Sequence, residues 1–454
     1  MVDLDQYASV GRDLRALARV GWPLILNNLF GIGTTVADTL MIGRLGATQL
    51  AALAIGSSLW IGIFLGGLGV LMALGPTVAQ HFGAKQYAAI GHDTHQAVWL
   101  ALIITVVVVA LLHAVTPLLT WLRIDAEVSR LAAGYLHALS FGVPGLYLYQ
   151  VMRQMNEGIG RTIPIMIVTA IALVINIALS AILVFGLWGG PRLGVLGSGI
   201  GSALSYWCMC GLLAFYIVRT PFYAPFDLWF VLRRPDPLAL RRLVALGGPI
   251  GLSLLMQAGL FTALALLMGT LGKNYAAAHQ ITLNYAGLVF MVPLGFAFAT
   301  AVLVGQAIGR RQPATALRVG KVGITLCLGI AAGFGLTTFL FAPCIARLYT
   351  QDAAVVSLAA SLLTISAFLQ VGDGTQSAAA GALRGLKDTR VPMVINGAIY
   401  WLVGFASAYS LGIGAGYGAR GIWFGLALAL CTAAIVLTWR FRRVVGRQIP
   451  VNNR

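Results

Sequence analysis

WPLILNNLFGIGTTVADTLMIGRLG, residues 22–46, is the stretch that decides the fold. It is apolar over more than the roughly 20 residues that a helix needs to cross a bilayer. Spacings of four, seven and four residues place a polar set on one face of that helix: Pro23, Asn27, Thr34 and Asp38. A carboxylate inside a span costs about 2.5–3.5 kcal/mol on insertion scales, and it commonly marks a water-filled pathway or a proton relay. Asp38 is therefore the first functional candidate.

The composition is that of an integral membrane protein. The 454 residues are 59% hydrophobic and only 9% charged, with a mean hydropathy of +0.88, whereas soluble domains are about 25% charged. A membrane β-barrel would need segments of about ten residues with alternating polarity, and the sequence has none. We therefore expect α-helical spans, in which every backbone polar group is hydrogen-bonded within its own segment.

The hydrophobic pattern predicts twelve spans, which makes the fold class an all-α polytopic membrane protein. They are expected near residues 15–38, 50–76, 93–116, 129–150, 164–186, 196–218, 243–269, 276–300, 317–341, 354–376, 392–412 and 419–439. An even number of spans puts both termini on the same side of the membrane. Most of the 30 Lys and Arg residues fall on that side, which the positive-inside rule identifies as the cytoplasm.

The formal charge of +17 does not indicate a nucleic-acid partner. The basic residues follow the loops of one side, where they meet membrane lipid headgroups. The first 20 residues contain charged positions and no apolar core of a signal peptide, so we expect no cleaved leader.

An internal repeat divides the chain into halves. Residues 14–86 align without a gap on residues 240–312, an offset of 226, and pairs such as Gly21 with Gly247 and Pro23 with Pro249 are identical. Because each half has an even number of spans, the two are parallel repeats about an axis along the membrane normal. We expect an N-lobe over 1–219, a cytoplasmic interfacial linker over 220–240 and a C-lobe over 241–454, which together form a V-shaped cleft.

Two carboxylates lie deep in the predicted spans, one in each half. Of the thirteen acidic residues, only Asp38 and Asp373 are far from a loop, a terminus or a span end. Such a group can take up a proton on one side of the membrane and release it on the other, or exchange it for a cation. The alternative is a structural Asp that ties two helices together by hydrogen bonds.

Other intramembrane side chains complete a candidate cavity. The polar candidates are Asn27, Asn28, Thr34, Asn176, Gln257, His279, Gln280, Asn284 and Gln370, and the adaptable aromatic and thioether candidates are Tyr285, Phe290, Met256 and Met291. The alternative for the amides is plain interhelical hydrogen bonding. For His279 it is a capping or structural bond, and for the aromatic and Met side chains it is ordinary core packing.

No motif of an enzyme, a metal site or a cofactor site is present in the sequence. His92 and His95 have a helical spacing, but no Cys or carboxylate cluster completes a metal site around them. No HExxH, GxSxG or P-loop occurs. We expect no catalytic residues, no bound metal and no cofactor.

Four stretches resemble a known family, the multidrug and toxic compound extrusion (MATE) transporters, and in particular their bacterial NorM-like branch. They are VADTLMIGRLGATQLAALAIG (36–56), GPTVAQHFGA (75–84), AAAHQITLNYAGLVFMVPLGFAFATAVLVGQAIG (276–309) and GALRGLKDTRVPM (381–393). The resemblance implies a monomer in the bacterial inner membrane, with two six-helix lobes. It also implies alternating-access export of small cationic amphipathic drugs or dyes in exchange for inward H⁺ or Na⁺.

Within this resemblance, Asp38 matches the family's span 1 carboxylate and Asp373 its span 10 carboxylate. The sequence departs from the family where Gln257 replaces a membrane-embedded Glu and Leu369 replaces a Tyr. Ser180 likewise replaces the Asp or Asn four residues after Asn176. Because a hard cation needs several oxygen ligands, these departures favour H⁺ over Na⁺ as the coupling ion at Asp38, Asp373 and Gln257.

Two other functions fit the sequence less well. A flippase for a lipid-linked precursor could have a similar two-lobe build, but a pyrophosphate substrate would need Arg or Lys within the spans, and none lies mid-span. A membrane-embedded enzyme or receptor is disfavoured by the duplicated helical bundle and by the missing catalytic motifs.

Overall fold

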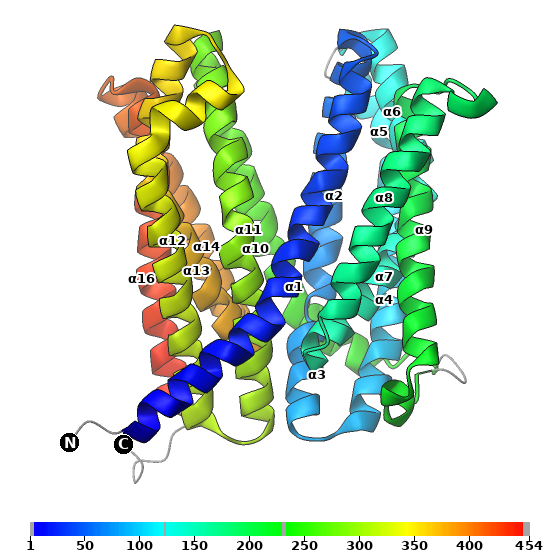
Figure 1. The fold of residues 1–454 in the computed structure, drawn as a ribbon, viewed down its shortest axis with the longest axis vertical. Helices are drawn as coiled ribbons and strands as arrows, with labels where there is room; N and C mark the ends of the chain where they lie inside the picture. The colour runs from blue at the N-terminus through cyan, green and yellow to red at the C-terminus, as the bar shows by residue number, and fades with distance from the viewer. Residues whose placement is uncertain (1–3, 122–123, 229–232, 448–454) are drawn as a thin grey trace. The chain divides into compact units, whose positions relative to one another are not determined.

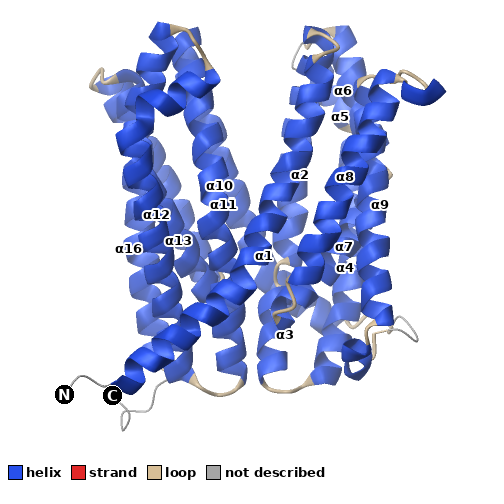
Figure 2. Cartoon of the chain, in the orientation of Figure 1, coloured by secondary structure: helices blue, strands red, loops and turns tan. Residues whose placement is uncertain are grey.

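The computed structural model describes residues 4–121, 124–228 and 233–447. Every regular element in these ranges is helical, as Figure 2 shows. Eleven helices are long and apolar enough to cross a membrane, and the count becomes twelve when α6 (Ala126–Ser140) and α7 (Val143–Ile159) form one span with a 51° bend. The prediction of an all-α polytopic membrane protein is confirmed.

The chain packs as two compact units (Figure 1). One unit runs from Leu26 to Gly251, and the other combines the residues up to Ile25 with those from Leu252 onward. Two helices belong partly to each unit: α1 (Leu4–Gly43) and α10 (Pro237–Thr270). The packing units are thus bounded differently from the predicted lobes 1–219 and 241–454, and residues 229–232 of the predicted linker lie outside the described chain.

The unit from Leu26 to Gly251 is built around a core that includes Trp60 and Tyr147. Its own elements are α2 (Ala47–Leu71), α3 (Leu74–Gly83), α4 (Tyr87–His113), α5 (Val115–Trp121), α6, α7, α8 (Ile163–Phe185), η1 (Leu187–Gly189), α9 (Val195–Arg219) and η2 (Pro221–Phe226).

The other unit is centred on α13, which packs against α11, α12 and α16. Its own elements are α11 (Lys273–Gly309), α12 (Pro313–Tyr349), α13 (Ala353–Gly385), α14 (Arg390–Ala398), η3 (Ile399–Phe405), α15 (Ala406–Tyr409), η4 (Ser410–Gly414) and α16 (Gly418–Gly446). The segments η3 and η4 are π-helical, so the span Arg390–Gly414 is wound more loosely than a regular helix.

Two of the sequence-based boundaries need correction. The stretch 22–46 is not one helix to its end, because α1 stops at Gly43 and Gly46 adopts a φ of 115° that favours glycine. The span predicted over 129–150 is broken at Phe141 and Gly142, where α6 ends and α7 begins in a new direction. Gly142 sits so close to Ala203 of α9 that a Cβ would lie 2.5 Å from the Ala203 Cα.

The two shared helices leave their first unit at equivalent places in the internal repeat. α1 passes from one unit to the other after Ile25, and α10 does so after Gly251, and 251 − 25 is the repeat offset of 226. Each helix has an internal proline two residues earlier, Pro23 and Pro249. Since proline removes one hydrogen bond from a helix, both helices are weakened at the same point of their repeat.

The contacts made by the shared helices are equivalent as well. In one unit Gly295 lies against Ile25, where a Cβ would be 2.9 Å from the Ile25 backbone nitrogen. In the other unit the equivalent of Gly295 is Gly69, and a Cβ there would overlap the backbone of Gly251. Small residues allow helices to approach backbone to backbone, which is the main source of helix association in a membrane.

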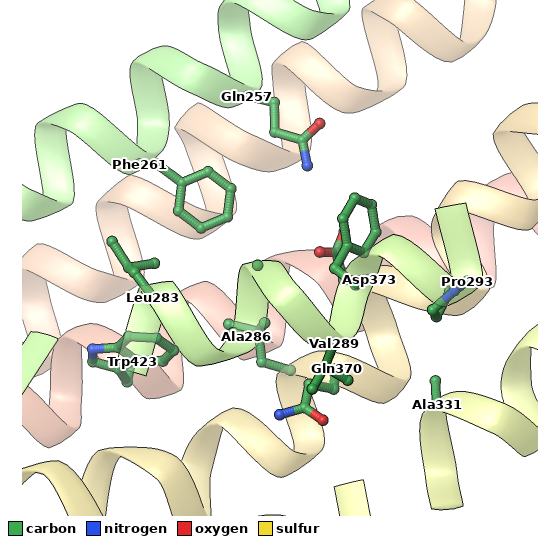
Figure 3. A pocket seen from close by; sticks show the side chains of 13 residues that line it. Gln257, Phe261, Leu283, Ala286, Val289, Pro293, Ala331, Gln370, Asp373 and Trp423 are labelled. Atoms are coloured by element: carbon green, nitrogen blue, oxygen red, sulfur yellow. The ribbon is translucent and has the colours of Figure 1, made fainter. Parts of the chain in front are cut away.

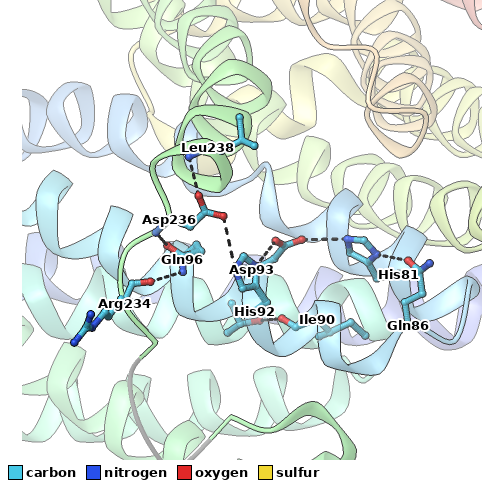
Figure 4. A network of polar contacts seen from close by, with 10 residues as sticks. His81, Gln86, Ile90, His92, Asp93, Gln96, Arg234, Asp236 and Leu238 are labelled. Atoms are coloured by element: carbon cyan, nitrogen blue, oxygen red, sulfur yellow. Dashed lines mark hydrogen bonds and ion pairs between the residues drawn. The ribbon is translucent and has the colours of Figure 1, made fainter.

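The segment before α10 is held on α4 by side-chain hydrogen bonds to its backbone (Figure 4). The Gln96 carboxamide donates to the Arg234 carbonyl at 3.0 Å and accepts from the Asp236 N–H at 2.8 Å. Nearby on α4, the Asp93 carboxylate accepts a hydrogen bond of 3.1 Å from His81 of α3 and lies 3.4 Å from a ring nitrogen of His92. Arg234 and Asp236 of the predicted linker are therefore fixed to α4, within the unit from Leu26 to Gly251.

The backbone contact at Gly69 can be tested with a matched pair of substitutions in α2. Gly69→Leu should lower the melting temperature of the purified protein and its yield, because overpacking typically costs about 1–3 kcal/mol and here the obstacle is the Gly251 backbone. Gly62→Leu should melt like the parent protein, since nothing lies within 4 Å of its Cβ position. Equal melting temperatures for the two variants would contradict the packing described here.

Candidate functional site

The polar face of α1 is buried where it enters the unit from Leu26 to Gly251. The exposed fractions of Asn27 and Asp38 are 4% and 6%. Asn27 accepts a hydrogen bond of 2.7 Å from the Thr169 hydroxyl, which also lies 2.9 Å from the Tyr149 hydroxyl. Asn27 therefore makes an interhelical hydrogen bond, which is the alternative role considered for the amides. Thr34, by contrast, donates to the Phe30 carbonyl of its own helix at 3.3 Å.

Asp38 lies against hydroxyl and amide groups from α8 and α9. The Ser202 hydroxyl donates to the Asp38 Oδ2 at 3.2 Å, and the Asn176 amide donates to the Ser202 oxygen at 3.2 Å. Ser180 and Ser198 lie near the same carboxylate and are fully buried. Residues four apart share one face of a helix, so Asn176 with Ser180 and Ser198 with Ser202 point the same way from their two helices.

This cluster is left with buried oxygens that have no hydrogen-bond partner in the described chain: Asp38 Oδ1, Asn176 Oδ1, Ser180 Oγ and Ser198 Oγ. A buried polar atom without a partner costs about 1–3 kcal/mol, and more when it is charged. The cluster is thus arranged to receive a proton, water or a small cation. We call these five residues, Asp38, Asn176, Ser180, Ser198 and Ser202, the Asp38 cluster.

The second deep carboxylate opens into a pocket of about 230 Å³ in the other unit (Figure 3). Leu283 and Trp423 close one end of this pocket, and Pro293 and Ala331 lie at the opposite end. The pocket is mainly apolar, with one carboxylate and two carboxamides. Its lining residues are Gln257, Phe261, Leu283, Ala286, Gly287, Val289, Phe290, Pro293, Ala331, Leu369, Gln370, Asp373 and Trp423. We call it the Asp373 pocket.

Glycines fix the position of Asp373 on α13. A Cβ on Gly372 would lie 2.8 Å from the Cys431 nitrogen of α16, and one on Gly374 would lie 3.2 Å from Pro293 of α11. These contacts hold α13 between its neighbours, so the carboxylate between the two glycines is buried to 8% exposure. Its Oδ1 has no hydrogen-bond partner among the described residues.

Two hydrogen-bonded groups, one of three residues and one of two, support the walls of the Asp373 pocket. Gln370 donates to the Thr338 hydroxyl at 3.2 Å, and the Tyr285 hydroxyl lies 3.1 Å from the same oxygen. At the other end the Trp423 indole N–H donates to the His279 Nδ1 at 3.2 Å. A neutral imidazole that accepts at Nδ1 has its hydrogen on Nε2, and that buried nitrogen has no partner in the described chain.

The remaining candidates lie outside the pocket lining. Gln280 is exposed, and the equally exposed Asn284 accepts a hydrogen bond of 3.1 Å from Tyr349. Met256 is partly buried and faces Gly397 of α14. Of the candidates from the sequence the pocket therefore brings together Gln257, Phe290, Gln370 and Asp373. Within the described ranges no group of three His, Cys, Asp or Glu side chains is arranged to hold a metal ion.

Sequence reasoning missed several members of both sites. Ser198 and Ser202 were available as a serine pair four residues apart in the run SGIGS (198–202). Trp423 had no such signal, because only the packing of α16 against α13 brings it to the Asp373 pocket.

A family model described as MatE matches residues 23–182 and 249–410. The chain belongs to the MatE family. The two matched segments are the two repeats, and each includes one of the deep carboxylates. The family is that of the MATE transporters that the sequence resembles.

Curated relatives extend the match over nearly the whole chain. The multidrug resistance protein NorM of Vibrio cholerae is 36% identical over 429 residues, which cover 93% of this chain and 94% of the relative. The multidrug resistance protein MdtK of Yersinia pseudotuberculosis is 34% identical over 97% of this chain and 96% of its own length.

Solved structures of MATE proteins share the fold. A MATE transporter of Vibrio cholerae, VcmN, aligns with a TM-score of 0.89 at 17% identity over 97% of this chain and 98% of that one. A crystal structure of MATE in the straight conformation aligns with a TM-score of 0.88 at 22% identity over 96% and 97% of the two chains.

Proposed function

We propose that this MatE-family protein is a secondary active transporter that exports small cationic amphipathic drugs or dyes and takes up H⁺ in exchange. The observation that carries the proposal is a buried carboxylate oxygen without a partner in each unit, at Asp38 and at Asp373. The names of the relatives, which are multidrug resistance proteins, support drugs as the substrate class. The protein moves its substrates and performs no catalysis on them.

The coupling follows from the energetics of a buried charge. An ionised carboxylate in an apolar site is costly unless a proton, an ion pair or a cation neutralises it. No ion pair is made by Asp38 or Asp373 within the described chain. A proton and a cationic substrate would therefore compete for the same carboxylate, and this competition couples their fluxes when access alternates between the two sides.

The Asp373 pocket supports an organic cation better than a metal cation. Phe261, Phe290 and Trp423 present aromatic side chains to the space beside the carboxylate, and aromatic faces attract cations. Gln257 and Leu369 supply a neutral amide and an apolar side chain, so Asp373 is the one anionic group among the described residues of the lining, whereas Na⁺ or another hard cation needs several oxygen ligands. This composition favours H⁺ over Na⁺ as the coupling ion.

The alternative, a flippase for a lipid-linked precursor, is less well supported. A pyrophosphate group would need Arg or Lys side chains, and none is among the residues that line the Asp373 pocket or form the Asp38 cluster. We further propose a monomer in the bacterial inner membrane, with both termini in the cytoplasm, two lobes over 1–219 and 241–454, and substrate access that alternates between the two sides of the membrane.

The role of Asp38 can be tested by its neutral isostere. Asp38→Asn should abolish the drug resistance that the protein confers on a sensitive bacterial host while leaving its level in the membrane unchanged, because the amide cannot exchange a proton. Minimum inhibitory concentrations and immunoblots of membranes would measure both. Asp352→Asn is a matched control, since Asp352 caps the N-terminus of α13 and Asn caps equally well. Resistance unchanged by Asp38→Asn would remove Asp38 from the mechanism.

The coupling ion can be tested with proteoliposomes in which H⁺ and Na⁺ gradients are imposed separately. A pH gradient alone should drive transport of a fluorescent cationic dye, and a Na⁺ gradient at constant pH should not. Protein-free liposomes control for passive dye redistribution. Robust transport with the Na⁺ gradient alone would reverse the assignment.

Position 257 carries an amide and no carboxylate, so introducing a carboxylate there should change which ion drives transport. Gln257→Glu should add an anionic oxygen beside Asp373 and raise the Na⁺ dependence of dye transport in the same proteoliposomes. Gln280→Glu, an equivalent change at an exposed position of α11, should leave the ion preference as it was. If both variants behave like the parent protein, position 257 has only a structural role.

A further inference from the structure

A lateral groove lies between the first part of α1 and the first half of α12, within one unit. Its volume is about 510 Å³, and it is separate from both carboxylate sites. Val10 and Leu14 form one wall, and the other wall is the α12 face formed by Lys321, Val322, Thr325, Leu326, Gly329 and Ile330. Beneath it, α1 and α12 are joined through Leu17, Val20 and Leu24, which pack on Val322 and Leu326.

The groove has a cation at one end and apolar surface along the rest. Lys321 is exposed, and among the side chains that the structure describes no acid forms an ion pair with it. Its neighbour Arg318, one turn earlier on α12, differs in that Asp13 of α1 accepts from it at 2.7 Å. The groove therefore presents an ammonium group whose charge the surrounding described side chains do not balance.

The apolar part is open and long enough for a hydrocarbon chain. Lys321 and Ile330 are nine residues apart on one helix, which corresponds to about 13 Å along its axis. Gly329 lies near the far end, is exposed, and has no heavy atom within 4 Å of its Cβ position. A flexible chain can thus lie against the α12 backbone at this point.

We propose that this groove binds one anionic phospholipid, with the phosphate of the headgroup on Lys321 and an acyl chain along Val322, Leu326 and Gly329. The phosphate supplies the negative charge that Lys321 lacks, and a basic residue beside a membrane surface gains about 1 kcal/mol from anionic lipid. The acyl chain covers the apolar walls. The bound lipid bridges α1 and α12, next to the direct pair of Asp13 with Arg318.

The chemistry of the groove excludes the transported substrate class as its occupant. A cationic drug would be repelled by Lys321. A zwitterionic phospholipid adds its own cation near the ammonium group, so it gains less from the same contact. The inference does not depend on the proposed transport function, because lipid binding is measured without transport.

The test is a lipid titration of the purified full-length protein followed by native mass spectrometry. Phosphatidylglycerol should bind at one site more tightly than phosphatidylcholine with the same acyl chains. Lys321→Gln should weaken phosphatidylglycerol binding about fivefold, equivalent to about 1 kcal/mol, and Lys321→Arg should restore it. Gly329→Leu should weaken it with the ammonium group intact, because the added side chain fills the groove.

Lys85→Gln is the matched control, since Lys85 is an exposed lysine in the other unit and its loss should leave phosphatidylglycerol binding unchanged. Melting temperatures of all variants identify any that fail to fold. The proposal is overturned if Lys321→Gln binds phosphatidylglycerol as tightly as the parent protein, if the two lipids bind equally, or if Lys85→Gln has the same effect as Lys321→Gln.

Discussion

The close approach of helix backbones at glycine is the constraint on which this structure depends. Inside a bilayer apolar side chains gain little by leaving the lipid, so helices associate through close packing and interhelical hydrogen bonds. Gly69 against Gly251 and Gly295 against Ile25 are the same contact made twice, once in each unit. Because these positions are related by the internal repeat, the duplicated sequence determines where α1 and α10 pass from one unit to the other.

The same constraint positions the chemistry. Asp373 lies between two glycines that hold α13 against α16 and α11, and its carboxylate faces a mainly apolar pocket. Asp38 is reached by serines from two helices, α8 and α9. One acid is thus surrounded by hydroxyls and the other by aromatic rings and amides, so the repeat halves share a scaffold but offer different environments to a proton or a cation.

Much of this could be predicted from the sequence, because it is local. Spans follow from runs of apolar residues, the repeat from identities at a fixed offset, and the buried side of α1 from helical periodicity. Four of the residues singled out in the sequence, Gln257, Phe290, Gln370 and Asp373, line one pocket of the structure. Contacts between distant helices could not be predicted in this way. Trp423 joins the site only through the packing of α16, and the division of α1 and α10 between the two units follows from their contacts rather than from the order of the spans.

The hydrogen bonds of Gln96 to the backbone on either side of residue 235 have a mechanical consequence. A connection between two repeats is often a flexible linker, which lets the repeats move over short distances at little cost in free energy. Here Arg234 and Asp236, just before α10, are hydrogen-bonded to Gln96 of α4, so these residues cannot follow a displacement of α10. Any displacement has to be taken up by bending of α10 itself. The helix bends most easily at Pro249, where one backbone hydrogen bond is missing.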